Sequence, residues 1–388
     1  MEKRIYLDHS ATTPVRKEVL AAMLPYLAEQ YGNPSSIYTE GREARKALEK
    51  ARDTVAEAIG ALPQEVFFTA SGTEADNWAL RGIAEAYAAK GNHLITSTIE
   101  HPAVLETCAD LSKKGWEITY LSVDENGLID LDELKSAIRE DTVLVSVMTA
   151  NNEIGTIQPV AEIGKICRER NVLFHTDAVQ AAGAIPIDVK EMEIDLLSLS
   201  GHKFYGPKGV GALYIRKGVK IAPFVTGGHQ ENGMRAATEN VAGIVGMAKA
   251  LELSVASMAE NTAKLKRLRD HTIARILAEI PFVKLNGDRM RRLPGHINFS
   301  FQFIEGESLL LMLDLAGIAA SSGSACTSGS LDPSHVLLAI GLPHETAHGS
   351  LRITFGAENT PEEADYLVDR LKQIVQKLRD MSPLYHAE

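Results

Sequence analysis

Short apolar runs alternate with amphipathic stretches between about residue 60 and residue 215 of the chain. The apolar runs predict seven strands, at Glu65–Thr69, His93–Thr98, Ile118–Leu121, Val143–Met148, Val172–Thr176, Leu196–Ser200 and Val210–Tyr214. Helical spacing in between predicts helices that include Thr73–Lys90, Ala103–Lys114, Asp130–Arg139 and Val160–Arg170. This alternation predicts an α/β fold, with a mostly parallel central sheet covered by helices on both faces.

A second unit is expected after this region. The stretch Ala259–Ile280 places apolar residues at helical spacing and predicts a long helix that leads into a smaller α+β domain. We therefore expect a large domain at residues 15–258 and a small domain made of residues 1–14 and 259–388. The small domain contains a Gly/Ser-rich segment at about residues 321–332, with Cys326 in its middle. That composition is typical of a mobile loop.

Composition and charge narrow the classes of partner. Of the 388 residues, 45% are hydrophobic and 23% are charged, as in ordinary globular proteins. A formal net charge of −11 argues against nucleic acid as the main partner, because phosphate backbones need a basic surface. We expect no signal peptide and no membrane span, since charge precedes any apolar run and Asp314 interrupts the most lipid-like stretch. Three cysteines without a CxxC pair favour a reducing, cytoplasmic compartment.

Polar side chains follow five of the predicted strands. In chain order they are Ala70–Glu74, Glu100–Pro102, Asn151–Glu153, Asp177 with Gln180, and Lys203. Ligands of an open α/β sheet bind beyond the carboxyl ends of its strands, so we expect these groups to share one site. The small residues that open a helix after the first strand would offer backbone amides to a phosphate.

The segment Ser200–Lys203 indicates the chemistry of this site. A lysine that ends a buried strand loses hydration, so its amine is neutral more often and can attack a carbonyl. A carbonyl cofactor with a phosphate, pyridoxal phosphate, fits such a lysine beside small polar residues. Asp177 would keep the pyridine nitrogen protonated, and the 26 residues from there to Lys203 leave room for one crossover between adjacent strands. His101 would stack on the ring, and Thr73, Ser200 and His202 would bind the phosphate.

Each of these residues taken alone also has an ordinary structural interpretation. Lys203 could be a solvated loop lysine, and Asp177 could cap a helix that begins near Ala178. His101 could simply start a helix, and Asn152 could be a turn residue. Gly206–Gly211 has a nucleotide-like pattern but leads into a strand, which favours a turn between two strands. Metal catalysis is poorly supported, and no metal-binding residue is expected.

Several motifs together resemble the cysteine desulfurases, which are fold-type I pyridoxal-phosphate enzymes of the class V aminotransferase group. The resemblance runs from about Tyr6 to Phe355 and is carried by Leu7–Pro14, Tyr31–Ser36, Glu100–His101, Asn151–Gly155, His175–Gln180 and Ser200–Lys203. Ser321–Cys326 followed by Asp332–Leu337 is similar to the long catalytic loop of the NifS/IscS branch, whereas the SufS-type branch has a shorter loop.

The resemblance implies a role for each matching residue that would bind the cofactor. Lys203 would bond to pyridoxal 5'-phosphate and then shuttle the substrate α-proton, while His101 would stack on the ring and assist proton transfer. Asp177 would pair with the pyridine nitrogen and Gln180 with the ring oxygen. The phosphate would be held by Gly72, Thr73, Ser200 and His202, and by Thr238 of the neighbouring subunit in a homodimer.

It also implies how the substrate would react. Asn152 and Arg352 would bind the carboxylate of L-cysteine, since a guanidinium meets a carboxylate bidentately. Cys326 as a thiolate would take the substrate sulfur as a persulfide, leaving L-alanine, and pass it to an iron–sulfur scaffold protein or another acceptor. Cys108 and Cys167 are expected to be buried structural residues. The departures from the family pattern are small, at His9, Tyr38 and Ala237, where glycine is more usual before Thr238.

Three rival functions remain open at this point. A selenocysteine lyase would use the same pocket, and a small-amino-acid aminotransferase would leave Cys326 without a role. A non-catalytic scaffold that docks iron–sulfur assembly proteins is disfavoured by the presence of both Lys203 and Asp177. The sulfur acceptor is open as well, and the C-terminal Leu384 and Tyr385 would be either a docking element or a frayed end.

Overall fold

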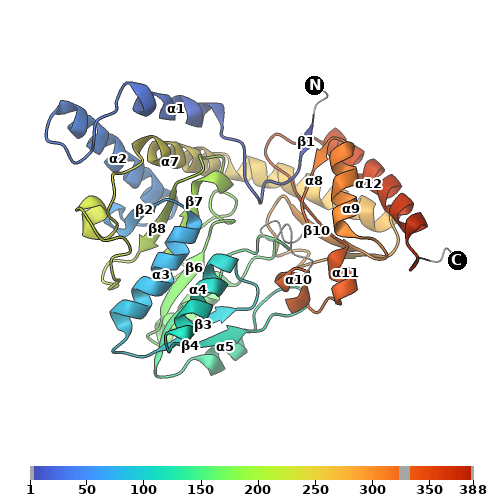
Figure 1. The fold of residues 1–388 in the computed structure, drawn as a ribbon, viewed down its shortest axis with the longest axis horizontal. Coiled ribbons are helices and arrows are strands. Elements are labelled where there is room, and N and C mark those ends of the chain that lie inside the picture. Colours follow the sequence, from blue (N-terminus) through green and yellow to red (C-terminus); the bar gives the residue numbers. More distant parts are fainter. Residues whose placement is uncertain (1–3, 323–332, 386–388) are drawn as a thin grey trace.

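The computed structural model describes residues 4–322 and 333–385, so Cys326 and most of the Gly/Ser-rich segment lie outside the described residues. The larger part is built on a seven-stranded sheet with helices on both faces (Figure 1). From edge to edge its strands are β2 (Val66–Thr69), β8 (Gly211–Ile215), β7 (Leu196–Ser200), β6 (Leu173–Asp177), β5 (Thr142–Ser146), β3 (His93–Ser97) and β4 (Glu117–Leu121).

The predicted mostly parallel sheet is confirmed. β7, β6, β5, β3 and β4 are parallel neighbours, and only β8 runs against its two neighbours, β7 and β2. All seven predicted strands are present, with ends that differ by one or two residues. The segment Gly206–Gly211 is a turn between the antiparallel β7 and β8, as its sequence context favoured.

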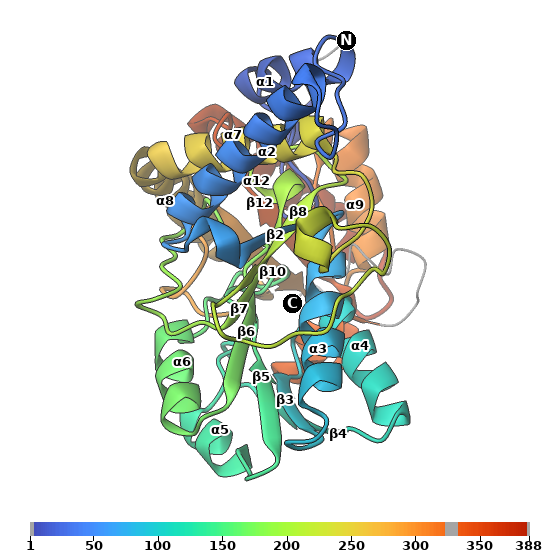
Figure 2. The same ribbon diagram turned by 90° about the vertical axis from the view of Figure 1, so that its left-hand side faces the viewer.

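Alternate residues of each strand pack on opposite layers of helices. Leu196 packs in a core with α3 (Gly72–Tyr87) and α4 (Pro102–Lys113), whereas Leu197 packs in the core beneath α6 and α7. That second layer is formed by α2 (Thr39–Ala58), α6 (Val160–Glu169) and α7 (Val241–Ala256), with α1 (Lys17–Ala28) and α5 (Leu131–Ala137) beside them. Figure 2 shows the sheet between α3 and α4 on one side and α6 on the other. The predicted helices are confirmed.

One alternative from the sequence is wrong: Asp177 does not cap a helix. The described segment 178–195 forms turns without a helix, and Asp177 is the last residue of β6. Its Oδ1 accepts a hydrogen bond from the amide of Val179 at 2.8 Å, which stabilises the first of these turns. The side chain therefore stays at the strand end, where it can also contact a ligand.

The remaining elements form a smaller unit with a core of its own. Its three-stranded antiparallel sheet consists of β12 (Ser350–Thr354), β10 (His296–Phe301) and β9 (Val283–Leu285), and β1 (Ile5–Tyr6) pairs in parallel with β11 (Ile318–Ala319). Its helices are α8 (Met258–Glu279), α9 (Gly306–Leu315), α10 (His335–Ala339), α11 (His344–His348) and α12 (Pro361–Met381). Its main core shares no residue with the two cores of the large sheet. We propose on this basis the domain boundaries 15–258 and 1–14 with 259–388.

The described C-terminal end is held against the smaller unit. The ring of Tyr385 lies 6.2 Å from that of Phe282 and 5.7 Å from that of Phe303, and Arg379 lies over it at 5.7 Å. Tyr385 is therefore not frayed, while Leu384 is 58% exposed. Among the described residues, no single helix is long and apolar enough to cross a bilayer; α7 and α8 meet that criterion only jointly, across a 70° bend.

Two cysteines occupy the interior, as predicted. Cys108 on α4 and Cys167 on α6 are both fully buried in apolar surroundings. Burial raises the pKa of Cys108 to about 12 and raises that of Cys167 as well. Neither thiol can supply a thiolate near neutral pH.

The segment between β8 and α7 carries backbone strain. Ala237 has φ of +108°, a conformation that L side chains rarely adopt. The same segment is anchored by a buried ion pair in which Arg52 Nη1 lies 2.8 Å from Glu231 Oε2. The anchor fixes the path of the chain, so the strain at Ala237 is retained rather than relaxed.

Replacing Ala237 by glycine should stabilise the protein. Glycine adopts φ of +108° without a Cβ penalty, and we expect a gain of about 1 kcal/mol in unfolding free energy. Gly115→Ala is the matched control, because φ there is +92° and a Cβ would meet nothing within 4 Å. This control should lose about 1 kcal/mol from backbone strain alone. Denaturant unfolding of both variants measures the effect, and an unchanged or lower midpoint for Ala237→Gly would show that the strain is absent.

Candidate active site

The carboxyl ends of five strands meet at one edge of the central sheet. β7, β6, β5 and β3 run parallel, and β2 has the same direction because it pairs antiparallel with β8. The polar groups that follow these strands therefore leave the sheet on the same side. The smaller unit covers this edge, since Arg352 Nη1 of β12 donates to the carbonyl oxygen of Asn152 at 3.0 Å.

Lys203 lies immediately beyond β7. The strand ends at Ser200, and the short 3₁₀ turn η2 (Gly201–Lys203) follows it directly. Nζ donates to the carbonyl oxygens of Ser10 at 2.5 Å and Ala11 at 2.9 Å. The amine is thus held by the backbone of the N-terminal segment at the sheet edge, and Lys203 is not a solvated loop lysine.

Asp177 and His101 lie on neighbouring parts of the same edge. Asp177 is 6% exposed, and burial raises the pKa of its carboxyl, while the neighbouring His101, the amide of Val179 and the charge of Lys203 act in the opposite direction. Burial lowers the pKa of His101. The Nδ1 atom of His101 accepts the amide of Ala103 at 3.1 Å and so caps α4. The neutral ring therefore carries its proton on Nε2, and this nitrogen is a donor.

α3 begins beside the end of β7. The Oγ of Ser71 caps α3 by accepting the amide of Glu74 at 3.1 Å, and Gly72 and Thr73 form the first turn. A Cβ on Gly72 would lie 2.7 Å from Val179 Cγ2 and 3.3 Å from Ser200 Cβ, so only glycine allows this close approach of the chains. Backbone amides at the helix start and the hydroxyl of Ser200 are groups that hold an anion.

His202 stands beside this position as a neutral ring. Burial, with the nearby charge of Lys203 as a second cause, lowers the pKa of His202 to about 4. Its Nδ1 is 3.1 Å from the hydroxyl of Thr12. His202 can therefore offer one N–H to an anion but carries no charge of its own at neutral pH.

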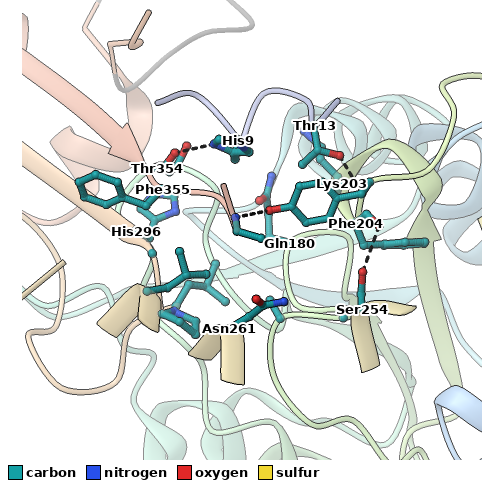
Figure 3. A pocket seen from close by; sticks show the side chains of 18 of the residues that line it. His9, Thr13, Gln180, Lys203, Phe204, Ser254, Asn261, His296, Thr354 and Phe355 are labelled. Atoms are coloured by element: carbon teal, nitrogen blue, oxygen red, sulfur yellow. Dashed lines mark hydrogen bonds between the residues drawn. The ribbon is translucent and has the colours of Figure 1, made fainter. Parts of the chain in front are cut away.

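Gln180 contacts the same N-terminal segment as Lys203. Its Nε2 donates to the carbonyl oxygen of Ser10 at 3.0 Å. A cavity of about 100 Å³ opens on this side of Lys203, between the two units (Figure 3). It is bounded by Gln180, Lys203 and His296, and His9 closes one wall by donating Nδ1–H to the carbonyl of Thr354 at 2.9 Å.

Arg352 is fixed by two bonds and keeps a further donor available. Its side chain is 2% exposed, and Nη2 donates to Asp8 Oδ1 at 2.7 Å in addition to the bond from Nη1 to Asn152. Nε is buried and has no hydrogen-bond partner among the described residues. Asn152 is thus brought to Arg352 through its backbone oxygen rather than its side chain.

Thr238 lies at the surface of this chain, as Thr73 does. It follows the strained Ala237. Arg235 ties the segment to the start of α3, since its Nε lies 2.8 Å from Glu74 Oε1. The segment therefore starts close to the first turn of α3 and presents Thr238 outwards.

Some residues at this edge were not predicted. Asp8 holds Arg352, the carbonyls of Ser10 and Ala11 hold Lys203, and the buried carboxyls of Asp76 and Glu100 lie close to Asp177. Asp8, Ser10 and Ala11 belong to the motif Leu7–Pro14. No spacing rule connects this motif to Lys203 and Arg352, which lie about 190 to 350 positions further along the chain. Asp76 lies within an ordinary amphipathic helix, where a polar residue carries no signal of burial.

Comparison with known proteins agrees with this geometry. The family model for aminotransferase class-V matches residues 5–367. A cysteine desulfurase IscS from Clostridium botulinum is 58% identical over 387 residues, covering 99% of this chain and 98% of that protein. The solved structure of a NifS-like protein has a TM-score of 0.92 at 41% identity, covering 97% of this chain and all of that one. The structure of SspA in complex with cysteine has a TM-score of 0.81 at 37% identity, covering 91% of this chain and 99% of that one.

The family match and the similarity to these relatives both extend over nearly the whole chain. The predicted fold-type I architecture and the resemblance to the NifS/IscS branch are confirmed. The chain belongs to the class-V aminotransferase family, and within it to the cysteine desulfurases.

Proposed function

We propose that the protein is a cysteine desulfurase that uses pyridoxal 5'-phosphate to remove sulfur from L-cysteine, giving L-alanine and a persulfide on Cys326. The proposal rests on one observation. Lys203, Asp177 and His101 lie at the same edge of the central sheet, next to the start of α3 at Gly72. These are an amine, a buried acid, a flat ring and an anion cradle, which a phosphorylated pyridine aldehyde requires.

The residues present fit that cofactor. Lys203 would hold its aldehyde carbon, Asp177 its ring nitrogen, and the amides of Gly72 and Thr73 with Ser200 and His202 its phosphate. The buried Asp177 supports this fit most directly, because burial raises the pKa of a carboxyl unless a cation compensates it. The bound cofactor supplies an electron sink for the substrate carbon that loses its proton.

The chain's own groups would then move protons and sulfur. Nζ of Lys203 takes the α-proton of the substrate, and Nε2–H of His101 can donate a proton because its Nδ1 is committed to α4. The thiolate of Cys326 attacks the substrate sulfur, so that an S–S bond forms as the C–S bond breaks. The electron pair left on the β-carbon takes up a proton, which gives the methyl group of alanine.

Replacing Cys326 should separate this function from its rivals. We expect Cys326→Ala to release alanine from L-cysteine with a reductant at below about 1% of the wild-type rate, because no other thiolate can accept the sulfur. Cys108→Ala is the matched control and should retain alanine release, since Cys108 is buried and its thiol has a pKa raised to about 12. Alanine from both variants would favour the selenocysteine lyase, and no alanine from any form would reopen the aminotransferase.

We propose that Arg352 binds the substrate carboxylate. Its unpartnered Nε donor, together with the remaining N–H groups, can bind a carboxylate without breaking the bonds to Asp8 and Asn152. Burial of the guanidinium strengthens that contact, because little water competes for it. The side chain of Asn152 would complete the carboxylate site from the large unit.

Removing this charge should weaken substrate binding. We expect Arg352→Gln to raise KM for L-cysteine by about 10- to 100-fold, as the loss of a charge-assisted hydrogen bond predicts. Arg139→Gln serves as the control, since Arg139 pairs at the surface with Asp141 and Glu117. Steady-state kinetics with cysteine check this, and an unchanged KM for Arg352→Gln would place the carboxylate elsewhere.

We also propose that the enzyme is a homodimer in which Thr238 reaches the phosphate of the neighbouring subunit. Exposed apolar side chains on α1 and the segment after it support this, because such side chains are more stable when a partner covers them. The members of this apolar face are Leu20, Leu24, Leu27, Tyr31, Ile37 and Tyr38. The exposed position of Thr238 beside the phosphate end of its own site is consistent with a contact in trans.

A charge placed on this face should dissociate the dimer. Leu24→Asp combined with Ile37→Asp changes side chains that are 54% and 89% exposed, so folding of the subunit should be unaffected. We expect a monomer in sedimentation velocity and weaker binding of pyridoxal phosphate, because Thr238 of the neighbour is lost. Leu315→Asp, at a side chain 87% exposed on α9, should remain dimeric. A dimeric double variant would contradict the assignment of this face.

The sulfur acceptor would be an iron–sulfur scaffold protein or another thiol carrier. The similarity to IscS-named relatives supports the scaffold, and persulfide transfer fits a reducing, cytoplasmic setting in which thiols stay free. The negative net charge does not favour nucleic acid as the acceptor.

A further inference from the structure

Asp76 is a buried acid that the proposed mechanism leaves without a role. It lies on α3, one turn beyond the helix start that would hold the phosphate, and is 1% exposed. Its Oδ1 has no hydrogen-bond partner among the described residues. A buried carboxyl in this condition is unfavourable when charged and requires an explanation.

A row of polar side chains leads from the interior of the sheet to Asp76. His175 of β6 is flanked by Ser146 of β5, with Oγ 2.8 Å from Nδ1, and by Ser198 of β7, with Oγ 3.0 Å from Nε2. His175 Nε2 also lies 3.7 Å from Asp76 Oδ1. Burial lowers the pKa of His175 to about 3, so the ring is neutral and cannot compensate a charge on Asp76.

The row ends at Asp76. Of the described hydroxyls, that of Ser198 acts on the carboxyl of Asp76 and favours its charged form. A hydroxyl has one proton, so Ser198 can donate to a charged Asp76 only when it accepts from Nε2–H of His175. Nδ1 of His175 then accepts from Ser146.

Asp177 lies two residues after His175 on β6, and so on the same face of the sheet as Asp76. The titratable groups that act on Asp76 are Asp177 and Glu100, with His175 as its neutral neighbour. Asp177 has the amide of Val179 and the charge of Lys203 to favour its ionised form. The charge of Asp177 raises the pKa of Asp76, and of two buried carboxyls that repel each other the compensated one takes the charge.

We propose that Asp76 is a positioning residue for the cofactor, keeping its own proton so that the negative charge of the acid pair stays on Asp177, opposite the ring nitrogen. The inference rests on the proposed cofactor site. A charge on Asp76 instead would leave Asp177 neutral and unable to hold a proton on the ring. The row Ser146–His175–Ser198 offers the carboxyl of Asp76 one hydroxyl and a neutral ring but no cation, so it does not compensate a charge on Asp76 as Lys203 does for Asp177.

The test measures the protonation state of the cofactor ring and the cofactor affinity rather than the rate of turnover. Wild type and Asp76→Asn are reconstituted with pyridoxal phosphate labelled with ¹⁵N in the ring, and the ring shift and cofactor affinity are followed against pH. The amide mimics a protonated acid, so at pH 7 we expect the same shift and an affinity within about twofold. At alkaline pH wild-type Asp76 ionises beside the ring, and wild type should bind about tenfold more tightly than the variant.

Two further variants test whether the gain in cofactor affinity at alkaline pH comes from Asp76. Ser198→Ala removes the hydroxyl that stabilises charged Asp76, so the pH at which wild type gains affinity should move upwards. Glu100→Gln is the matched control, because Glu100 is also buried near Asp177 and burial raises its pKa to about 8. Glu100→Gln alone should keep the alkaline gain in affinity, whereas Asp76→Asn added to Glu100→Gln should remove it.

Each outcome decides the matter. A deprotonated ring nitrogen or an affinity more than about tenfold weaker at pH 7 in Asp76→Asn would show that Asp76 carries charge, and overturns the proposal. Curves of wild type and variant that coincide at every pH overturn it as well. If Asp76→Asn does not fold, Ser198→Ala decides alone, and an unmoved alkaline gain overturns the proposal. A wild type that binds no pyridoxal phosphate, shown by the lack of visible absorption, overturns the cofactor site and this inference together.

Discussion

Burial of charged groups at the carboxyl edge of the central sheet is the constraint on which the site depends. Asp177, Glu100 and Arg352 are all buried, and water cannot compensate them. Each must be paired, hydrogen-bonded or neutral. Arg352 is paired with Asp8, Glu100 accepts Ser97 Oγ at 2.5 Å and the amide of Met148 at 3.0 Å, and Asp177 uses the amide of Val179. A negative charge on Asp177 is only partly compensated by that amide, and a cationic ring nitrogen would compensate the rest.

The N-terminal segment joins the two units around this edge. Ser10 and Ala11 accept the amine of Lys203 from the large unit, while Asp8 binds Arg352 from the smaller one. Tyr205 adds a direct bond, since its hydroxyl accepts the amide of Ala357 at 2.8 Å. Because the two groups that would hold cofactor and substrate share one short segment, a shift of either unit changes their separation. A substrate carboxylate bound at Arg352, as proposed, would thereby be coupled mechanically to the position of Lys203.

The sequence predicted the fold well because the strands of a parallel sheet are buried on both faces and so read as continuous apolar runs. It also predicted which residues gather, since the strand-end rule needs only the strand order along the chain. The sequence did not predict contacts between residues far apart in the chain, nor burial that the local hydrophobic pattern does not indicate. The bond from Arg352 to Asp8 spans 344 positions, and the crossover after Asp177 forms turns where a helix cap was one interpretation. The burial of Asp76 follows from packing between α3 and the sheet, which its helical periodicity does not reveal.

The sulfur chemistry is constrained by the same burial that shapes the cofactor site. The chain has three cysteines, and the structure places Cys108 and Cys167 in apolar interiors where burial raises the pKa of each thiol. A thiol that cannot ionise cannot attack sulfur, and a thiol without access to solvent cannot pass sulfur to another protein. Both requirements point to Cys326, in the Gly/Ser-rich segment whose composition suits a residue that must meet the buried site and then an external acceptor. In the proposed mechanism the edge of the sheet would activate the substrate, while sulfur transfer needs a thiolate, which the described residues of that edge do not supply.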